Sequence, residues 1–252
     1  MKEAQTRFTT EALVIKEMNV GESDRLVTLF TRDYGIIKAF APGAKSIKSK
    51  KGAATSLLAF SSFTLLKKKD TYSICEAVPI RLFFGAGTDI SVLALSQYFC
   101  ELCGVFAAAE VPDGELLRLI LNSLHFLTKE KRFPPLIKAV TELRTAVLSG
   151  YMPDLVACNG CGKFEDDIMY FDIKNGALYC GDCKPDGAEF VWLDRTLVSA
   201  MRHIVYSEFK NLYSFTVPEE NARRLADITG KYITVQTDHR FSTLDFYNSI
   251  KE

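Results

Sequence analysis

The chain is organised around residues 158–183, which begin with Cys158-Asn-Gly-Cys161 and end with Cys180-Gly-Asp-Cys183. Eighteen residues separate the two Cys-x-x-Cys pairs, a spacing typical of a zinc site with four thiolate ligands. Gly160 and Gly181 are expected to let each pair turn tightly, and Asn175-Gly176 predicts a type I′ hairpin that returns the second pair to the first. Four protein ligands leave no open coordination position, so the predicted zinc site is structural and not catalytic.

The composition around this stretch is that of a soluble globular protein. Of 252 residues, 48% are hydrophobic and 25% are charged. The polar start predicts no signal peptide, and the longest apolar helical pattern, 90–109, contains Glu101 and is too polar to span a bilayer. Seven cysteines, four of them in metal-type spacing, favour the reducing cytoplasm over a disulfide framework.

Charge is unevenly distributed along a chain whose formal net charge is zero. Residues 1–80 hold 13 Lys/Arg against 8 Asp/Glu, a net charge of +5, whereas residues 81–252 hold 18 against 23, a net charge of −5. A basic N-terminal third on a neutral chain suggests that this third meets a polyanion.

The first eighty residues read as short strands separated by turn residues. The expected strands are 12–15, 25–30, 36–40, 63–66 and 72–75. Five strands in about seventy residues suit a small barrel. The OB-fold is common among barrels that bind nucleic acids, and an SH3-like barrel fits the same strand count nearly as well.

Lysines gather in the connection between the third and fourth expected strands, where Ser and Gly residues favour a flexible cationic arm. Such an arm can follow phosphates. The candidate phosphate-binding cations of the barrel and arm are Arg25, Arg32, Lys38, Lys45, Lys48, Lys50, Lys51, Lys67 and Lys68. Six rings could stack on bases, although rings at alternate strand positions are more often core: Phe30, Tyr34, Phe40, Phe60, Phe63 and Tyr72.

From residue 79 onward the hydrophobic period becomes helical. Helices are expected after the caps Asp89, Asp113 and Asp194, after Pro134 and Pro218, and after Ser242. We expect these helices to form one bundle, and a third Cys-x-x-Cys, at Cys100 and Cys103, to be part of its core. The predicted class is therefore α+β: an OB-fold barrel (1–80), an all-α helical domain (81–152 and 188–252) and an inserted four-cysteine zinc module (153–187).

Catalytic signatures are missing from the sequence. It contains no phosphate-loop, serine-hydrolase or zinc-protease motif, and its three histidines show no catalytic spacing. No catalytic residue is therefore predicted. Two alternative functions remain open: an adaptor whose barrel binds peptide or RNA, and a thiol oxidoreductase that uses a Cys-x-x-Cys, although the βαβ context of redox pairs is lacking.

Five stretches, in the same order, closely resemble the family of the bacterial DNA repair protein RecO. They are NVGESDRLVTLFTRDYG (19–35), APGAKSIKSKKG (41–52), ELRTAVLSGYMPDLVACNGCGK (142–163), ALYCGDC (177–183) and HRFSTLDFY (239–247). The resemblance implies a non-enzymatic recombination mediator that binds single- and double-stranded DNA and anneals complementary strands. With RecR, such a protein helps to load RecA onto single-stranded DNA coated with single-strand-binding protein (SSB).

The resemblance also assigns roles to residues of this chain. DNA contacts would come from Arg25, Arg32 and Lys38 on the barrel and from the lysines of the arm. The zinc ligands would be Cys158, Cys161, Cys180 and Cys183. The SSB tail would need a cation for its terminal carboxylate, with Lys138, Arg144, Arg223 and Arg224 as candidates. The protein is expected in the cytoplasm, where it would associate with the nucleoid and not with a membrane.

Overall fold

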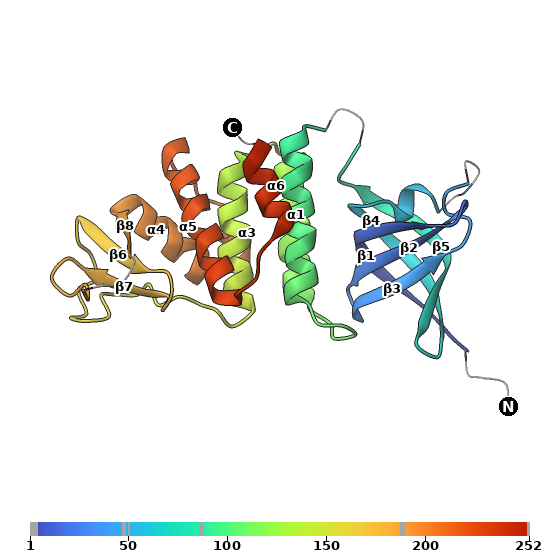
Figure 1. Cartoon of the computed structure of the whole chain (residues 1–252), viewed down its shortest axis with the longest axis horizontal. Helices are drawn as coiled ribbons and strands as arrows, with labels where there is room; N and C mark the ends of the chain where they lie inside the picture. Colours follow the sequence, from blue (N-terminus) through green and yellow to red (C-terminus); the bar gives the residue numbers. More distant parts are fainter. Residues whose placement is uncertain (1–4, 47–48, 50, 86–87, 187–189, 251–252) are drawn as a thin grey trace. The chain divides into compact units, whose positions relative to one another are not determined.

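The computed structural model describes residues 5–46, 49, 51–85, 88–186 and 190–250. They form two compact units (Figure 1). The first unit runs to Glu130 and resumes at Ser242, and the second is Lys131–Phe241. The first holds a barrel and helices, and the second holds helices and a small sheet, which confirms the α+β class. In the ranges described, no helix is long and apolar enough to cross a membrane.

A closed barrel forms the N-terminal part of the first unit, in the strand order β1-β2-β3-β5-β4 (Figure 1). Its strands are β1 (Gln5–Val20), β2 (Asp24–Thr31), β3 (Gly35–Ala41), β4 (Ala59–Lys68) and β5 (Thr71–Leu82). The β3–β5 pair is parallel and the other four pairs are antiparallel. This strand order, with its parallel β3–β5 pair, confirms the OB-fold and excludes the SH3-like alternative.

The barrel interior is narrow and rich in alanine. Seven alanines line it among branched and aromatic side chains: Ala12, Ala39, Ala41, Ala44, Ala54, Ala59 and Ala77. A short 3-10 helix (Ala53–Thr55) between β3 and β4 buries two of its three residues against this core. Of the six candidate stacking rings, Phe30, Phe60, Phe63 and Tyr72 are buried. For these four rings, the core interpretation is the right one.

The start of β3 packs against the segment that follows the first helix of the same unit. The Ile36 amide donates to the Ala108 carbonyl (3.2 Å), and the Glu110 amide donates to the Ile36 carbonyl (3.2 Å). Gly35 has φ +60° at this contact, and a Cβ there would lie 2.2 Å from the carbonyl oxygen of Val111. Only glycine fits, because both the left-handed backbone and the missing side chain are needed.

Three helices complete the first unit: α1 (Ile90–Phe106), α2 (Gly114–Thr128) and α6 (Ser242–Ile250). Asp89 and Asp113 accept hydrogen bonds from the first-turn amides of α1 and α2, as predicted. Helix α6 packs on α1 (Figure 1), where Glu101 accepts hydrogen bonds from the amides of Ser242 (3.2 Å) and Thr243 (3.0 Å). The carboxylate of α1 therefore caps the C-terminal helix.

The second unit contains α3 (Pro134–Leu148), α4 (Arg195–Tyr206) and α5 (Glu219–Thr237), with α3 packed on α5 (Figure 1). Asp194 caps α4 as predicted, and α4 ends at Tyr206. The C-terminal helices pack on the helices before the cysteine module, as expected. The structure divides them between two units, however, where the sequence had suggested one bundle.

The cysteine module of this unit contains a three-stranded sheet in the order β7-β6-β8. Its strands are β6 (Ile168–Asp172), β7 (Ala177–Cys180) and β8 (Phe190–Asp194). The β6–β7 hairpin was predicted and β8 was not. Strand β8 leads directly into α4, so the sheet is continuous in sequence with the helical part of the unit.

We predict that Gly35→Ala lowers the free energy of unfolding by about 3 kcal/mol or more, because the new Cβ meets the backbone of Val111. Gly21→Ala is the matched control: Gly21 has φ +59° but open space around it, so about 1 kcal/mol of backbone strain is expected. Urea titrations followed by circular dichroism measure both changes. Equal losses for the two variants would show that the β3 contact does not depend on close approach.

Candidate metal centre and nucleic-acid interface

The four cysteine sulfurs of the module lie together. Each sulfur of Cys158, Cys161, Cys180 and Cys183 is within 4.8 Å of the others, and the sulfurs of Cys161 and Cys180 are 3.7 Å apart. A tetrahedral ion with metal–sulfur bonds of about 2.3 Å requires sulfurs about 3.8 Å apart. The donor set therefore fits a four-thiolate metal site.

Backbone geometry holds the first pair against the second. A Cβ on Gly160 would lie 2.7 Å from the Cβ of Cys183, so the expected close approach at Gly160 is present. The second pair also turns tightly, with the Cys183 amide donating to the Cys180 carbonyl (3.2 Å), although a Cβ on Gly181 would meet only Tyr170, at 3.9 Å. The residue of the first knuckle with a left-handed backbone is Gly162 (φ +75°).

The turn between β6 and β7 also differs from the prediction. Asp172 pairs with Ala177, so four residues and not two form the loop. The Asp172 carboxylate accepts hydrogen bonds from the amides of Lys174 and Asn175, both 3.0 Å, and only Gly176 has a positive φ (+64°). A type I′ turn would need a positive φ at Asn175 as well. The hairpin is present, and a carboxylate shapes its turn.

Hydrogen bonds shift the pKa values of two cysteines of the cluster in opposite directions. Burial acts to raise the pKa of Cys158, but backbone N–H groups of Cys180, Cys161 and Gly160 lower it to about 6. The Cys180 amide donates to the Cys158 sulfur at 3.2 Å. The pKa of Cys183 is raised to about 12, because its thiol hydrogen-bonds to the sulfurs of Cys161 and Cys180. A bound divalent ion would stabilise coordinating cysteines as thiolates.

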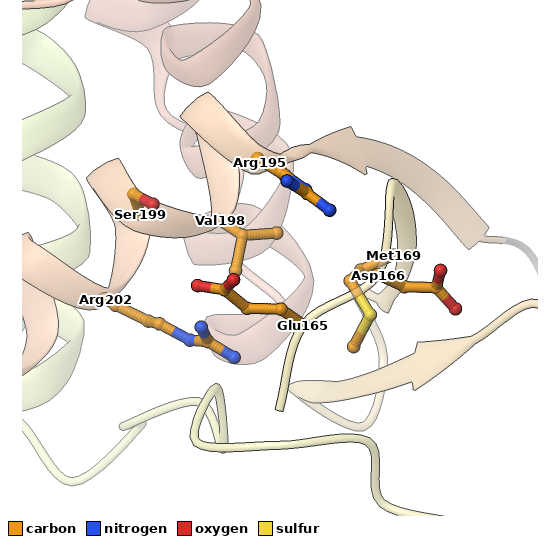
Figure 2. Close-up of a pocket in the computed structure, with 7 residues that line it drawn as sticks. All are labelled: Glu165, Asp166, Met169, Arg195, Val198, Ser199 and Arg202. Carbon is orange, nitrogen blue, oxygen red and sulfur yellow. The ribbon is translucent and has the colours of Figure 1, made fainter. Parts of the chain in front are cut away.

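Arg202 of α4 anchors the segment that carries the first cysteine pair. Its guanidinium donates to the carbonyls of Leu155 (2.7 Å), Val156 (3.0 Å) and Phe164 (2.6 Å). A small pocket beside it, with a volume of about 10 Å³, is shown in Figure 2. Ligand sites usually measure about 300–1,000 Å³, and Arg195 at the pocket already pairs with Asp167 (3.0 Å). We therefore assign this pocket no ligand.

The outer face of β2 and β3 is the surface with which OB-folds bind oligonucleotides. Lys38 is exposed there, opposite Thr28 of β2. Phe40, two residues along β3, is half-buried on the same face, and Tyr34 at the preceding turn is 38% exposed. This face therefore offers one exposed cation and one partly accessible ring on β3, with Tyr34 at the preceding turn.

The lysine arm is anchored near both of its ends. The Lys45 ammonium donates to the Gly21 carbonyl (3.3 Å), and its amide donates to Ser23 (2.9 Å). Lys51 is half-buried and donates to the Ile74 carbonyl of β5 (3.3 Å). Lys48 and Lys50 lie outside the described residues. Lys45 is thus exposed beside the β1–β2 turn, whereas Lys51 turns back onto the barrel.

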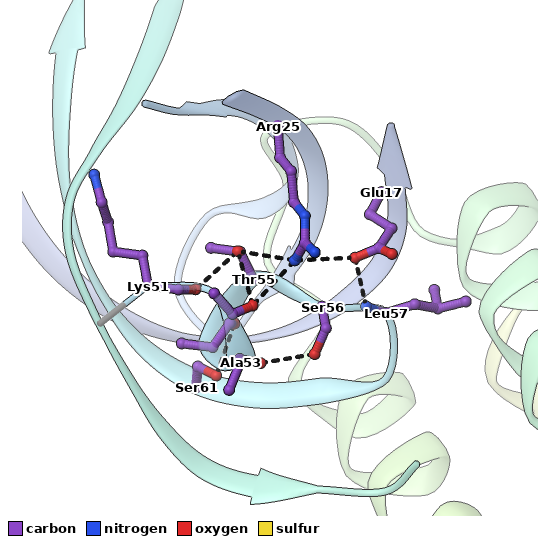
Figure 3. Close-up of polar contacts among 10 residues, drawn as sticks. Glu17, Arg25, Lys51, Ala53, Thr55, Ser56, Leu57 and Ser61 are labelled. Carbon is purple, nitrogen blue, oxygen red and sulfur yellow. Dashed lines mark hydrogen bonds and ion pairs between the residues drawn. The ribbon is translucent and has the colours of Figure 1, made fainter. Parts of the chain in front are cut away.

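Arg25 is engaged within the barrel rim (Figure 3). It donates to the Gly52 carbonyl (3.0 Å) and to Thr55 Oγ1 (3.4 Å), and it lies 3.5 Å from Glu17. Its side chain is 20% exposed. Glu17 in turn accepts from the Leu57 amide (3.0 Å), so Arg25 and Glu17 together hold the end of the arm and the 3-10 helix.

The remaining barrel cations lie at the turns and at the β4–β5 end. Arg32 is 58% exposed and pairs with Glu11 at 2.6 Å. Lys67 lies 4.9 Å from the ring centre of Tyr72 and 3.4 Å from Glu110. Its hydrogen bond to Tyr72, followed by the charge of Glu110, raises the pKa of Lys67. Lys68 is exposed at the end of β4. Both ends of the barrel therefore carry cations.

The four cations proposed for the SSB tail have different surroundings. Lys138 is 3% exposed, and its ammonium bonds to Glu142 (2.8 Å) and to the Ala226 carbonyl (2.7 Å). Arg144 donates to the last carbonyls of α4, at Ile204 and Val205. A carboxylate could reach the Lys138 ammonium only by displacing Glu142. Such a displacement is costly, because it would leave the charge of Glu142 buried and uncompensated.

The two remaining candidates are more open. The Arg223 side chain is 52% exposed, stacks over Phe133 at 4.9 Å and lies 3.6 Å from Glu219. The Arg224 side chain is 27% exposed and stacks over Trp192 at 3.7 Å. Arg223 and Arg224 are neighbours on α5, but they lie over different rings. Sequence reasoning also did not identify Glu17 as a partner of Arg25, since no local pattern marks a contact formed across the barrel.

We predict that Arg25→Ala lowers the free energy of unfolding by about 1–2 kcal/mol and speeds tryptic cleavage of the arm, because two hydrogen bonds at its base are lost. Arg32→Ala is the control: its exposed ion pair with Glu11 contributes within about 0.5 kcal/mol. Urea titration and timed trypsin digestion give the two readouts. Unchanged cleavage in the Arg25 variant would contradict its role in positioning the arm.

Comparisons with known proteins cover nearly the whole chain. The family profile "Recombination protein O N terminal" matches residues 1–83, and "Recombination protein O C terminal" matches residues 87–245. The DNA repair protein RecO of Acetivibrio thermocellus is 32% identical over 241 residues, 96% of each chain. That of Caldicellulosiruptor bescii is 29% identical over 242 residues, 96% of this chain and 98% of the relative. This chain therefore belongs to the RecO family of DNA repair and recombination proteins.

Proposed function

We propose that this protein is a non-enzymatic recombination mediator that binds single- and double-stranded DNA through its barrel and anneals complementary strands. With RecR, it would help to load RecA onto single-stranded DNA coated with SSB, in the cytoplasm at the nucleoid. Family membership over nearly the whole chain supports this role. The observation that carries DNA binding is the OB-fold strand order, which puts Lys38 and Phe40 on the outer β2–β3 face.

Annealing by such a surface needs no bond chemistry. Cations that neutralise phosphates release counterions and reduce the repulsion between two strands. Lys38, Lys45 and Arg32 are exposed and would make phosphate contacts, while Tyr34 and Phe40 could stack on bases. Arg25 would act through the position of the arm, because its guanidinium is already bonded to Gly52 and Thr55. The proposed interface thus separates contact residues from a positioning residue.

We propose zinc as the ion of the four-cysteine site. Soft thiolates in a tetrahedral arrangement select zinc or iron–sulfur centres, and Cys-x-x-Cys pairs that close on a single ion are typical of structural zinc. A bound zinc ion would cross-link the two knuckles of the module. The chain's own contribution is the close approach at Gly160 and the N–H···S bond from Cys180 to Cys158.

Among the candidate cations for the SSB tail, Arg223 suits the role best. It is the most exposed of the four, and Phe133 beside it offers an apolar wall. Thermal melting with a tail peptide and with the Arg223→Ala variant would test this assignment.

The thiol oxidoreductase alternative finds little support in the cysteines. Redox-active cysteines have low pKa values and partial exposure. Cys100 and Cys103 are buried in α1, where burial raises the pKa of Cys100 to about 12 and that of Cys103 well above its ordinary value. The remaining pairs are brought together as one donor set of four. The other alternative is an adaptor whose barrel binds RNA or peptide. A binding assay in which RNA or peptide competes with single-stranded DNA would distinguish it from the main proposal.

Replacing Lys45, Lys48 and Lys50 with Ala should weaken binding to single-stranded DNA and reduce the slope of log affinity against log salt by about 2, because phosphate contacts are lost. Lys210→Ala, an exposed lysine of the second unit that pairs with Glu208, should leave the slope unchanged. Fluorescence anisotropy with a labelled oligonucleotide at several salt concentrations gives the slope. An unaltered slope in the triple variant would count against the arm as a phosphate contact.

The protein purified under reducing conditions should contain one zinc per chain, and Cys158→Ser should lose most of it. Zinc binding to such modules contributes on the order of 10 kcal/mol, so hydrogen exchange should rise across residues 158–183 while the barrel stays protected. Cys75→Ser, at an exposed cysteine outside the cluster, is the control and should keep its zinc. Elemental analysis without zinc, or with full zinc in Cys158→Ser, would refute this site.

A further inference from the structure

The small sheet of the second unit carries a row of aromatic side chains on the face opposite its core. Tyr170 on β6 lies opposite Tyr179 on β7 and opposite Trp192 on β8, so three rings share one face. Phe190, two residues before Trp192, joins them with its ring centre 5.8 Å from that of Tyr179. The other face packs inward through Met169, Phe171, Leu178 and Leu193. We call the four rings the aromatic face.

The aromatic face is partly open. Trp192, the one tryptophan of the sequence, is 50% exposed, and the other three rings are half-buried. Aromatic side chains gathered on an exposed surface commonly mark an interaction site. Half-exposure of Trp192 leaves a large apolar area in contact with water, and burial of that area would stabilise the protein. Its exposure therefore points to a bound partner.

The rings already hold cations of the same chain. The Arg224 guanidinium lies 3.7 Å from the ring centre of Trp192. The Lys184 ammonium lies 4.9 Å from the ring centre of Tyr170 and 5.7 Å from that of Phe190. Cations are attracted to the negative face of an aromatic ring. The aromatic face therefore has the chemistry of a cation-binding surface.

The charge around these rings has the sign that attracts a cation. Residues 153–194 contain nine Asp/Glu and three Lys/Arg, and Arg195, Arg202 and Arg224 of the neighbouring helices contact this segment, which leaves a net charge of −3. The side chains of Asp167 and Asp182 are each 90% exposed. One of the three lysines, Lys163, is already paired with Asp166 at 2.9 Å. This field repels a phosphate backbone and draws a basic segment toward the aromatic face.

We propose that the aromatic face is a docking site for a lysine- and arginine-rich segment of a partner protein. The aliphatic parts of such a segment would cover Trp192 and Tyr179. Its charged ends would take the places of Lys184 and Arg224 over the rings or lie beside the carboxylates. Single-stranded nucleic acid is the competing occupant, because bases also stack on rings, but its phosphates would have to approach a net charge of −3. The docking site uses none of the residues of the proposed DNA interface.

The test uses the full-length protein and its single tryptophan as the probe. A short Lys/Arg-rich peptide should quench or shift the Trp192 emission with saturation, and raising salt from about 50 mM to about 200 mM should weaken binding, since exposed charges are screened. A matched Asp/Glu-rich peptide should give no saturable signal. Tyr179→Ala should lower the affinity for the basic peptide about threefold to fivefold, because one cation–π contact is lost.

Tyr34→Ala, an exposed ring of the barrel, is the control and should leave peptide affinity unchanged. Circular dichroism spectra that match the parent protein verify that Tyr179→Ala is folded, and its half-buried, outward position makes this the expected result. A basic peptide without effect on Trp192 emission would overturn the proposal. An oligonucleotide that quenches Trp192 and loses affinity in Tyr179→Ala would overturn it in favour of nucleic acid.

Discussion

Two residue pairs, Ala39 with Tyr72 and Phe40 with Ser73, join β3 to β5 in parallel and close the barrel. The rest of the proposed interface depends on this short contact. Closure turns alternate residues of β3 inward, where alanines keep the interior narrow, and leaves Lys38 on the outer face. A shift of one residue in this register would bury the lysine and expose Ile37, so the position of the cation and the stability of the core are linked.

Two segments of the chain, the barrel and the stretch that carries the small sheet, differ in the sign of their charge. Residues 1–80 carry a net charge of +5, while residues 153–194 contain six more acidic than basic residues, together with four potential thiolates. A polyanion would be drawn to the first segment and repelled by the second. The anchoring of the module by Arg202, through three carbonyls, fixes where that negative charge lies within the second unit.

Features encoded by neighbouring residues were predictable, and features formed across the fold were not. The caps at Asp89, Asp113 and Asp194 were predicted because a side chain there bonds amides two or three residues away. The four-cysteine cluster was predicted because its spacing constrains the ligands directly. The partners of Arg25 in the 52–55 segment could not be predicted, since they are 27 and 30 residues distant, and its role as a DNA contact stays a prediction. The predicted type I′ turn was wrong, because the Asp172 carboxylate accepts hydrogen bonds from the amides of Lys174 and Asn175 and shapes a four-residue loop.

The most direct test of the central claim is the rate at which complementary oligonucleotides anneal after both have been coated with SSB. Fluorescence energy transfer between labels on the two strands reports duplex formation in real time. If the barrel of this RecO-family protein neutralises phosphates on two strands at once, adding it should accelerate annealing at low ionic strength, and raising salt should remove the acceleration. Folded protein that leaves the rate unchanged at low ionic strength would contradict the account.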